Sequence, residues 1–229
     1  MITQPATEPL IYHSVHRNPS APEYWTDEMA VVDAAPHDFD IARWLLADEL
    51  SSIQVFSGKQ NAFAGRLRDP LVMVLRTRSG ALVTVETSMN VGYAYDIRGE
   101  VVGERGTAAL ADPGRISTRS DNRAGTDLPV DWRERFIEAY DAELRAWIDA
   151  LTAGAEPSGP SSWDGYAAQV ASEAGVRSLK SGERIDISEI ERPSLYETSL
   201  AMCGDRASER SSDRRVDPHP EAEQAEMRS

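Results

Sequence analysis

Short runs of β-branched and aliphatic residues follow one another through residues 52–111, and this pattern constrains the fold more than any other feature of the chain. The dipeptide Ser79-Gly80 separates two of the runs and predicts a tight hairpin, because glycine accepts a positive φ. Strands that are adjacent in sequence and joined by short turns favour an antiparallel sheet. The predicted strands are residues 52–57, 71–77, 81–89, 97–103 and 107–111.

One face of this sheet is predicted to be covered. Val83, Val85 and Thr87 alternate with more polar residues, and successive side chains of a strand point to opposite faces. An earlier strand is predicted over residues 10–16, ending at the turn sequence Arg17-Asn18-Pro19. The sequence therefore indicates a sheet whose first strand comes well before the rest.

Helices are predicted before and after the strand block in the sequence. Pro36 suits the first turn of a helix that runs to about residue 47, because no backbone N–H is needed at that position. Ile41, Trp44 and Leu45 are spaced three and four residues apart and are predicted to form the buried stripe of this helix. A short helix is predicted near residue 28. Two longer helices follow at residues 132–153 and 162–179, and a last short strand at residues 185–187.

Composition excludes several classes of protein. The chain has 229 residues and 41% hydrophobic residues, enough for one core, and its formal net charge of −14 argues against nucleic-acid binding. A single cysteine, Cys203, excludes an internal disulfide framework and a cysteine-rich metal site. No apolar run approaches the roughly 20 residues of a membrane span, and no secretion signal is recognisable. The expected location is the cytoplasm.

The chain is predicted to comprise one domain with polar ends. Residues 1–9 are polar, carry two prolines and are expected to be flexible. The domain is expected to span residues 10–190. Residues 191–229 are rich in serine and mixed charges, cannot offset the entropy of ordering, and are predicted to be a disordered tail.

Asp33 and His37 are the first candidate site residues. Their spacing of four places a carboxylate and an imidazole about one turn apart on one face of a helix. A carboxylate beside a histidine orients the ring and raises its basicity, which suits proton abstraction. The same pair is also typical of a solvated helix surface. It resembles half of a metal site, but the sequence offers no third ligand at a convincing spacing, so no metal is predicted.

Two other clusters are candidates for a cleft. His16 and Asn18 lie at the end of the predicted first strand, where polar side chains are well placed to line a cleft. Tyr93 and Tyr95 either pack at the rim of the sheet or offer a phenol hydroxyl to a polyol. The glycine-rich run from Gly99 to Gly106 lies among strands with no following helix, so it is rejected as a dinucleotide loop.

Taken together, these segments resemble the inositol 2-dehydrogenases of the Gfo/Idh/MocA group of NAD(P)-dependent sugar oxidoreductases, from about Ile11 to about Ile187. Several ordered motifs carry the resemblance, which makes it far more specific than any one of them. The motifs are His-Arg-Asn-Pro at 16–19, residues 33–46 with Arg-Trp-Leu-Leu at 43–46, Arg-Asp-Pro at 68–70, residues 93–103, Asp-Trp-Arg-Glu-Arg-Phe at 131–136 and residues 159–166.

The resemblance implies a substrate domain of the α+β class, with an open, mostly antiparallel sheet and helices packed on one face. It implies that the other face of the sheet forms a homo-oligomer. It also implies oxidation of a secondary alcohol of myo-inositol or a related polyol by NAD or NADP. His37 matches the base, Asp33 its partner and a substrate ligand, and His16, Asn18 and Tyr95 match residues that bind the polyol, with Tyr93 as the alternative to Tyr95.

The chain departs from that family in three respects. Pro36 directly precedes His37, the tail beyond Glu191 has no recognised counterpart, and the family's first domain is missing. The family's first domain is a dinucleotide-binding fold with a glycine fingerprint and a catalytic lysine, and the sequence from Met1 onward contains neither. One hypothesis is therefore a catalytic half that works only with a separate dinucleotide-binding chain and does not bind NAD alone. The alternative is a non-catalytic module that binds a polyol or oligomerises, and a third possibility is a degenerate gene or a misassigned start codon.

Overall fold

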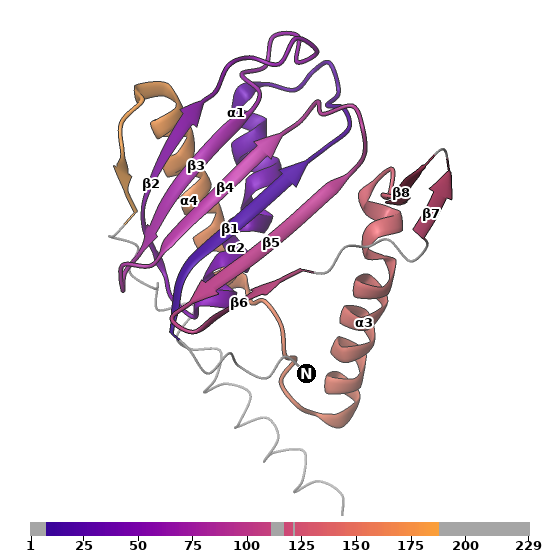
Figure 1. Cartoon of the computed structure of the whole chain (residues 1–229). Helices are drawn as coiled ribbons and strands as arrows, with labels where there is room; N and C mark the ends of the chain where they lie inside the picture. The colour runs from indigo at the N-terminus through magenta and orange to yellow at the C-terminus, as the bar shows by residue number, and fades with distance from the viewer. Residues whose placement is uncertain (1–7, 111–116, 121, 188–229) are drawn as a thin grey trace, which may run out of the picture. The chain divides into compact units, whose positions relative to one another are not determined.

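A computed structural model describes residues 8–110, 117–120 and 122–187, and its main feature is a seven-stranded sheet with the order β6-β5-β1-β4-β3-β2-β9 (Figure 1). The parallel pairing of β1 with β4 is the exception, because every other neighbouring pair of this sheet is antiparallel. The strands are β1 (Pro9–Arg17), β2 (Leu50–Ser57), β3 (Leu71–Thr77), β4 (Leu82–Ser88), β5 (Asp96–Gly103), β6 (Gly106–Ala109) and β9 (Ile185–Asp186).

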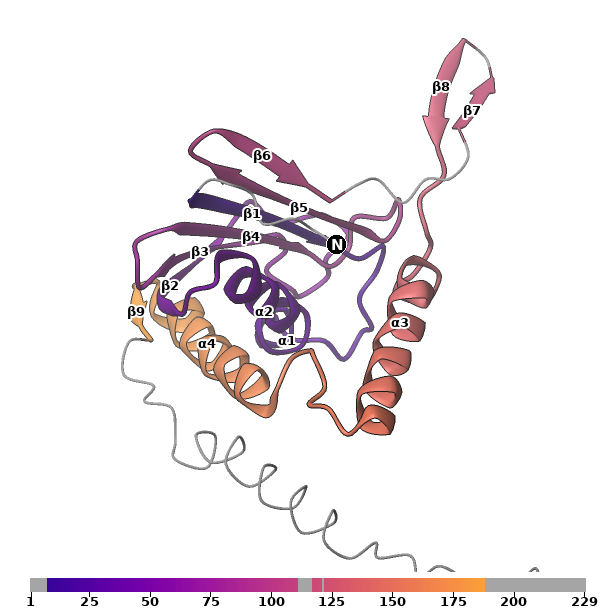
Figure 2. The ribbon, with the colours of Figure 1, turned by 90° about the horizontal axis from the view of Figure 1, so that it is seen from below.

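The helices are α1 (Asp27–Met29), a π-helical turn η1 (Ala30–Ala34), α2 (Ala35–Leu46), α3 (Trp132–Ala153) and α4 (Ser162–Ser181). Figure 2 shows α1, α2 and α4 on one side of the sheet, while the other side is open. The predicted class, α+β with an open, mostly antiparallel sheet and helices on one face, is confirmed. The parallel pair was not predicted, because β1 and β4 are far apart in sequence and no local turn signals their pairing.

The core lies between the sheet and helices α2 and α4. Val83 and Val85 are fully buried and Thr87 nearly so, which confirms the covered face predicted for this strand. Gly175 lets α4 approach both η1 and the sheet, since a Cβ at this position would lie 2.7 Å from Cγ1 of Val31 in η1 and 3.3 Å from Cδ1 of Ile53 in β2. A capping box of Ser161 and Asp164 begins α4.

The predicted buried stripe of α2 is wrong at two of its three positions, because only Leu45 is partly buried against the core. Ile41 and Trp44 are exposed, at 42% and 70%. The buried face instead carries small residues that let the helix lie close to the sheet, together with one aromatic ring and two charged side chains. These residues are Ala35, Asp38, Phe39, Ala42, Arg43 and Leu46.

Helix α3 has the predicted bounds, but none of its residues is buried. Tyr140, Leu144, Trp147 and Leu151 all lie between 45% and 57% exposed. A small two-stranded sheet of β7 (Ser117–Ser120) and β8 (Arg123–Thr126) was not predicted.

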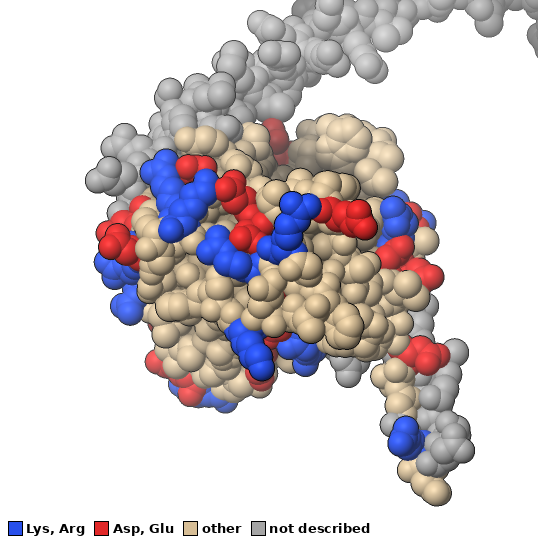
Figure 3. Space-filling view, turned by 90° about the horizontal axis from the view of Figure 1, so that it is seen from above, with Lys and Arg blue, Asp and Glu red and all other residues tan. Residues whose placement is uncertain are grey.

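Several predictions concern residues that the structure does not describe. The predicted tail 191–229, including Cys203, and residues 1–7 of the predicted N-terminal segment lie outside the described residues. No helix within the described part is long and apolar enough to cross a membrane. Figure 3 shows acidic and basic side chains interspersed on one surface of the molecule.

Candidate active site

A cavity of about 500 Å³ lies where β1 ends, between the sheet, α2 and the beginning of α3. All five site residues predicted from the sequence line it, together with Asp38. Aromatic and aliphatic side chains form the rest of the wall, which is the usual composition of a small-molecule site. These further lining residues are Trp25, Ala34, Ile41, Ile97, Trp132, Phe136 and Tyr140.

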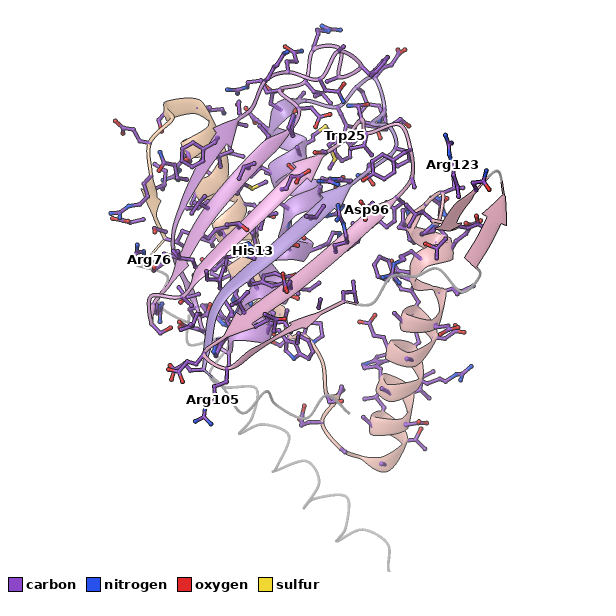
Figure 4. All side chains as sticks on the ribbon, viewed as in Figure 1. His13, Trp25, Arg76, Asp96, Arg105 and Arg123 are labelled. Carbon is purple, nitrogen blue, oxygen red and sulfur yellow. The ribbon has the colours of Figure 1, made fainter. Side chains whose placement is uncertain are left out.

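Strand β1 carries His16 to the cavity. From Ile11 onward its even-numbered residues face the helices and its odd-numbered residues face the open side, so His16 is buried while His13 is exposed. Asn18 follows directly after the strand, and its backbone N–H bonds to the carbonyl of Ser88 at 2.9 Å. Figure 4 marks His13 on the sheet, with Trp25 and Asp96 toward the end at which β1 finishes.

Asp33 and His37 reach the cavity from two different helical segments. Asp33 lies in the π-helical turn, which closes with a hydrogen bond from Ala35 N–H to the carbonyl of Ala30, and His37 lies in the first turn of α2. Pro36 takes one of the first two positions of α2, as predicted. The described residues show no hydrogen bond between Asp33 and His37.

Asp38 is the functional candidate that sequence reasoning missed. Its carboxylate is 3% exposed, and its Oδ2 lies 3.0 Å from Nδ1 of His16. Its other oxygen accepts a hydrogen bond from Ser14 Oγ at 2.5 Å. One signal was available: β1 carries Tyr12, Ser14 and His16 on its covered face, and buried polar groups require partners.

Tyr95 and the histidines form an aromatic cluster in the cavity. The ring of His16 stacks on that of His37 with centroids 6.5 Å apart, and meets the ring of Tyr95 edge-on at 6.1 Å. The ring of Phe136 in α3 also meets that of Tyr95 edge-on, with centroids 6.3 Å apart. Burial, and then the charge of Asp38, raises the pKa of Tyr95 to about 12, so its hydroxyl keeps its proton at neutral pH.

A larger cavity, of about 740 Å³, lies beside the C-terminal half of α2 and contains none of the predicted site residues. Its charged groups pair with one another, since Arg43 binds Glu49 and also lies 3.1 Å from Asp164. Trp163 donates a hydrogen bond to Glu49 at 3.1 Å. The Arg43 motif and the motif at 159–166 therefore meet in a structural ion-pair network.

The glycine-rich run at residues 99–106 does not form a dinucleotide-binding turn. Gly99 and Gly103 lie in β5 and Gly106 in β6, and the two strands form an antiparallel hairpin with no helix after it. A phosphate-binding turn needs a strand, a glycine loop and a helix N-terminus. Across the described ranges, no group of three or more His, Cys, Asp or Glu residues is placed to hold a metal ion.

Comparison with known proteins agrees with this fold. Residues 8–187 match the oxidoreductase family C-terminal α/β domain of the Gfo/Idh/MocA type. The chain is 42% identical over 190 residues to an inositol 2-dehydrogenase/D-chiro-inositol 3-dehydrogenase from Halalkalibacterium halodurans, and 44% identical over 190 residues to an inositol 2-dehydrogenase from Pseudomonas fluorescens. The matches cover 82% of this chain and 55% and 56% of those two proteins.

Solved structures give the same result. The myo-inositol dehydrogenase from Lactobacillus casei, in complex with NAD(H) and myo-inositol, superposes with a TM-score of 0.77 at 34% identity, covering 82% of this chain and 56% of that one. A scyllo-inositol dehydrogenase from the same organism, with a TM-score of 0.70 and 15% identity, shows the fold alone. This chain belongs to the Gfo/Idh/MocA oxidoreductase family, as a C-terminal α/β domain, and spans about half the length of the curated relatives that it matches.

Proposed function

We propose that this chain is the substrate-binding and proton-accepting half of a dehydrogenase that oxidises a secondary alcohol of myo-inositol or a related cyclic polyol. The main support for the proposal is that the five site residues predicted from the sequence all line one cavity. Its volume of about 500 Å³ suits a small ligand. Relatives named as inositol dehydrogenases, at 42% and 44% identity, support the substrate class.

The proposed roles follow the chemistry of each side chain. His37 accepts the hydroxyl proton, since a neutral imidazole is suited to general base catalysis near neutral pH. Asp33 binds the substrate and strengthens His37 as an acceptor once the ligand has drawn the two together. His16 and Asn18 bind further hydroxyl groups. Tyr95 donates a hydrogen bond, because its raised pKa keeps the phenol protonated.

The oxidation also needs a hydride acceptor, which NAD or NADP supplies when it is bound. The glycine-rich run at residues 99–106 forms a hairpin rather than a dinucleotide-binding turn, which supports placing the dinucleotide on a separate binding chain or domain. Polyol binding, water exclusion by the aromatic wall and proton acceptance remain with this chain. We therefore expect the isolated chain to be inactive and not to bind NAD; a micromolar dissociation constant for NAD would contradict this division of roles.

The alternative is a non-catalytic module that binds a polyol or only oligomerises. The lack of a dinucleotide-binding turn among the described residues favours it. The open face of the sheet favours self-association in either case, because Phe56, Val72 and Leu82 are exposed there at 46%, 37% and 36%.

Calorimetry of the purified chain with myo-inositol is the first test. Binding that is lost in the His37→Ala variant and kept in His13→Ala supports the cavity, because His13 lies on the exposed face of the sheet. If the titration with myo-inositol releases no heat and the chain forms a stable oligomer, only a structural, oligomerising role remains for the chain. NADH formation from NAD and myo-inositol, with and without a candidate dinucleotide-binding partner, then separates the enzyme from the binding module.

A further inference from the structure

The covered face of β1 is polar where it meets α2. Tyr12, Ser14 and His16 point toward the helix and are 4%, 3% and 6% exposed, whereas Ile11 and Val15 occupy the open face. A strand covered on one face normally buries its apolar residues there. The reversed pattern means that α2 must provide a hydrogen-bonding partner, because unpaired polar groups are costly to bury.

Asp38 of α2 is that partner. It lies at the end of a short chain of hydrogen bonds in which Tyr12 donates to Ser14 at 3.4 Å and Ser14 donates to Oδ1 of Asp38 at 2.5 Å. Oδ2 lies 3.0 Å from Nδ1 of His16. The other groups facing this pair are the rings of Tyr95 and His37, which stand against the His16 ring.

The chemistry of these groups fixes where the protons lie. An ionised carboxylate only accepts hydrogen bonds, so its contact with Nδ1 of His16 requires a proton on that nitrogen. In the neutral imidazole the remaining nitrogen, Nε2, then carries a lone pair. Nε2 is the ring nitrogen farther from Asp38, and His16 lines the cavity. A carboxylate that holds a histidine tautomer in this way acts through the ring, without touching the ligand.

We propose that Asp38 is the positioning residue of the cavity, holding His16 with its proton on Nδ1 so that Nε2 accepts a hydrogen bond from a ligand hydroxyl. The identification of the ligand as a polyol rests on the proposed function. The assignment of the His16 tautomer does not depend on that function. The two histidines then differ in role. His16 is a fixed acceptor with a buried carboxylate partner, while the described residues show no such partner for His37.

The tautomer can be measured in the full chain by long-range ¹H–¹⁵N spectra of the imidazole rings, with His16→Ala assigning the signals. The expected result is a neutral His16 protonated at Nδ1. Ser14→Ala is the matched control, because it removes the other hydrogen bond to Asp38 and should leave the tautomer unchanged. Asp38→Asn should shift His16 toward the Nε2-protonated form. A wild-type His16 that is protonated at Nε2 overturns the proposal.

Calorimetry with myo-inositol on the same samples separates this inference from the proposed function. We expect Asp38→Asn to weaken binding about tenfold, the effect of about one hydrogen bond, and Ser14→Ala to change it much less. If His16 has the predicted tautomer but the chain does not bind myo-inositol, the proposed function is contradicted and the role of Asp38 is supported. Binding with His16 protonated at Nε2 would remove the role of Asp38 alone. If Asp38→Asn and Ser14→Ala lose the same affinity for myo-inositol and neither changes the His16 tautomer, Asp38 is only a structural link between β1 and α2.

Discussion

Arg43 and Glu49 form a two-point ion pair, in which Nε and a terminal nitrogen of the guanidinium each lie 2.8 Å from a carboxylate oxygen. The Arg43 side chain is 7% exposed, and its charge is balanced by this partner, by Asp164 and, at 3.4 Å, by Asp40. The pair joins the end of α2 to the segment before β2, and Asp164 adds the first turn of α4. Because α2 also carries the candidate site residues His37 and Asp38, this network sets the position of the cavity wall.

Replacing Glu49 by glutamine should lower the free energy of unfolding by roughly 1.5–3 kcal/mol, because a charge-assisted hydrogen bond to a buried guanidinium is lost. Urea unfolding followed by circular dichroism measures the change. The matched control is Glu173→Gln, which breaks an exposed pair with Arg177 and should cost less than about 1 kcal/mol. Equal losses in the two variants would show that the Arg43 network is no stronger than a surface pair.

The same pair predicts how stability depends on pH. Hydrogen bonds from Arg43 are the main reason why the pKa of Glu49 lies below its ordinary value of 4.5. A carboxyl group whose pKa is lowered by folding contributes stability above its unfolded pKa and loses it as the pH falls through the folded value. The stability difference between the wild type and Glu49→Gln should be constant from neutral pH to about pH 5, then shrink in more acidic solution. A difference that grows on acidification would reverse the assigned sign.

Two glycines of α4 should respond in opposite ways to alanine. Gly175→Ala places a Cβ 2.7 Å from Val31 Cγ1 and 3.3 Å from Ile53 Cδ1, so the core must shift, and we expect a net loss of about 1–2 kcal/mol. At Gly165 a Cβ meets nothing within 4 Å, so alanine should gain up to about 1 kcal/mol from helix propensity. Thermal unfolding of both variants measures the contrast. Stabilisation by both substitutions would mean that α4 does not pack closely on the sheet.

Local sequence patterns predicted most of the fold, because strands and turns are short-range features. The hairpin at Ser79-Gly80 and the alternation around Val85 needed only neighbouring residues, and Gly80 does adopt a positive φ of 102°. The predicted rotation of α2 about its axis, which decides the face that is buried, was wrong for a physical reason. Large apolar residues were taken to mark the buried face, but close packing against the sheet selects small residues such as Ala42, and Trp44 is left exposed.

The candidate site was predictable as a set of residues and not as a set of contacts. His16 and Asp38 are 22 residues apart, and their contact depends on the register of β1 and on the rotation of α2. Neither quantity can be read from periodicity. The spacing of Asp33 and His37 suggested a hydrogen-bonded pair, whereas the π-helical turn changes the geometry between them and the histidine with a carboxylate partner is His16.

His37→Ala should lower the turnover of a reconstituted enzyme by at least about 100-fold, the usual contribution of a general base. The fold should survive, because His37 is exposed and lies at the edge of the cavity. Rates of NADH formation give the turnover, and thermal unfolding checks the fold. His13→Ala serves as the control on the opposite face of the sheet and should retain full turnover. An unfolded His37→Ala variant would favour a structural role for this histidine.

The open face of the sheet should mediate self-association. Phe56 and Val72 are paired across β2 and β3, and both are exposed, so a charge at Val72 would be buried in any contact made through this face. Val72→Arg should therefore reduce the oligomer to a monomer in light-scattering measurements. Phe63→Arg is the control, because Phe63 is 86% exposed outside the strands and should leave the mass unchanged. A monomeric wild type would exclude the oligomer, and an oligomer that survives Val72→Arg would place the interface on another surface.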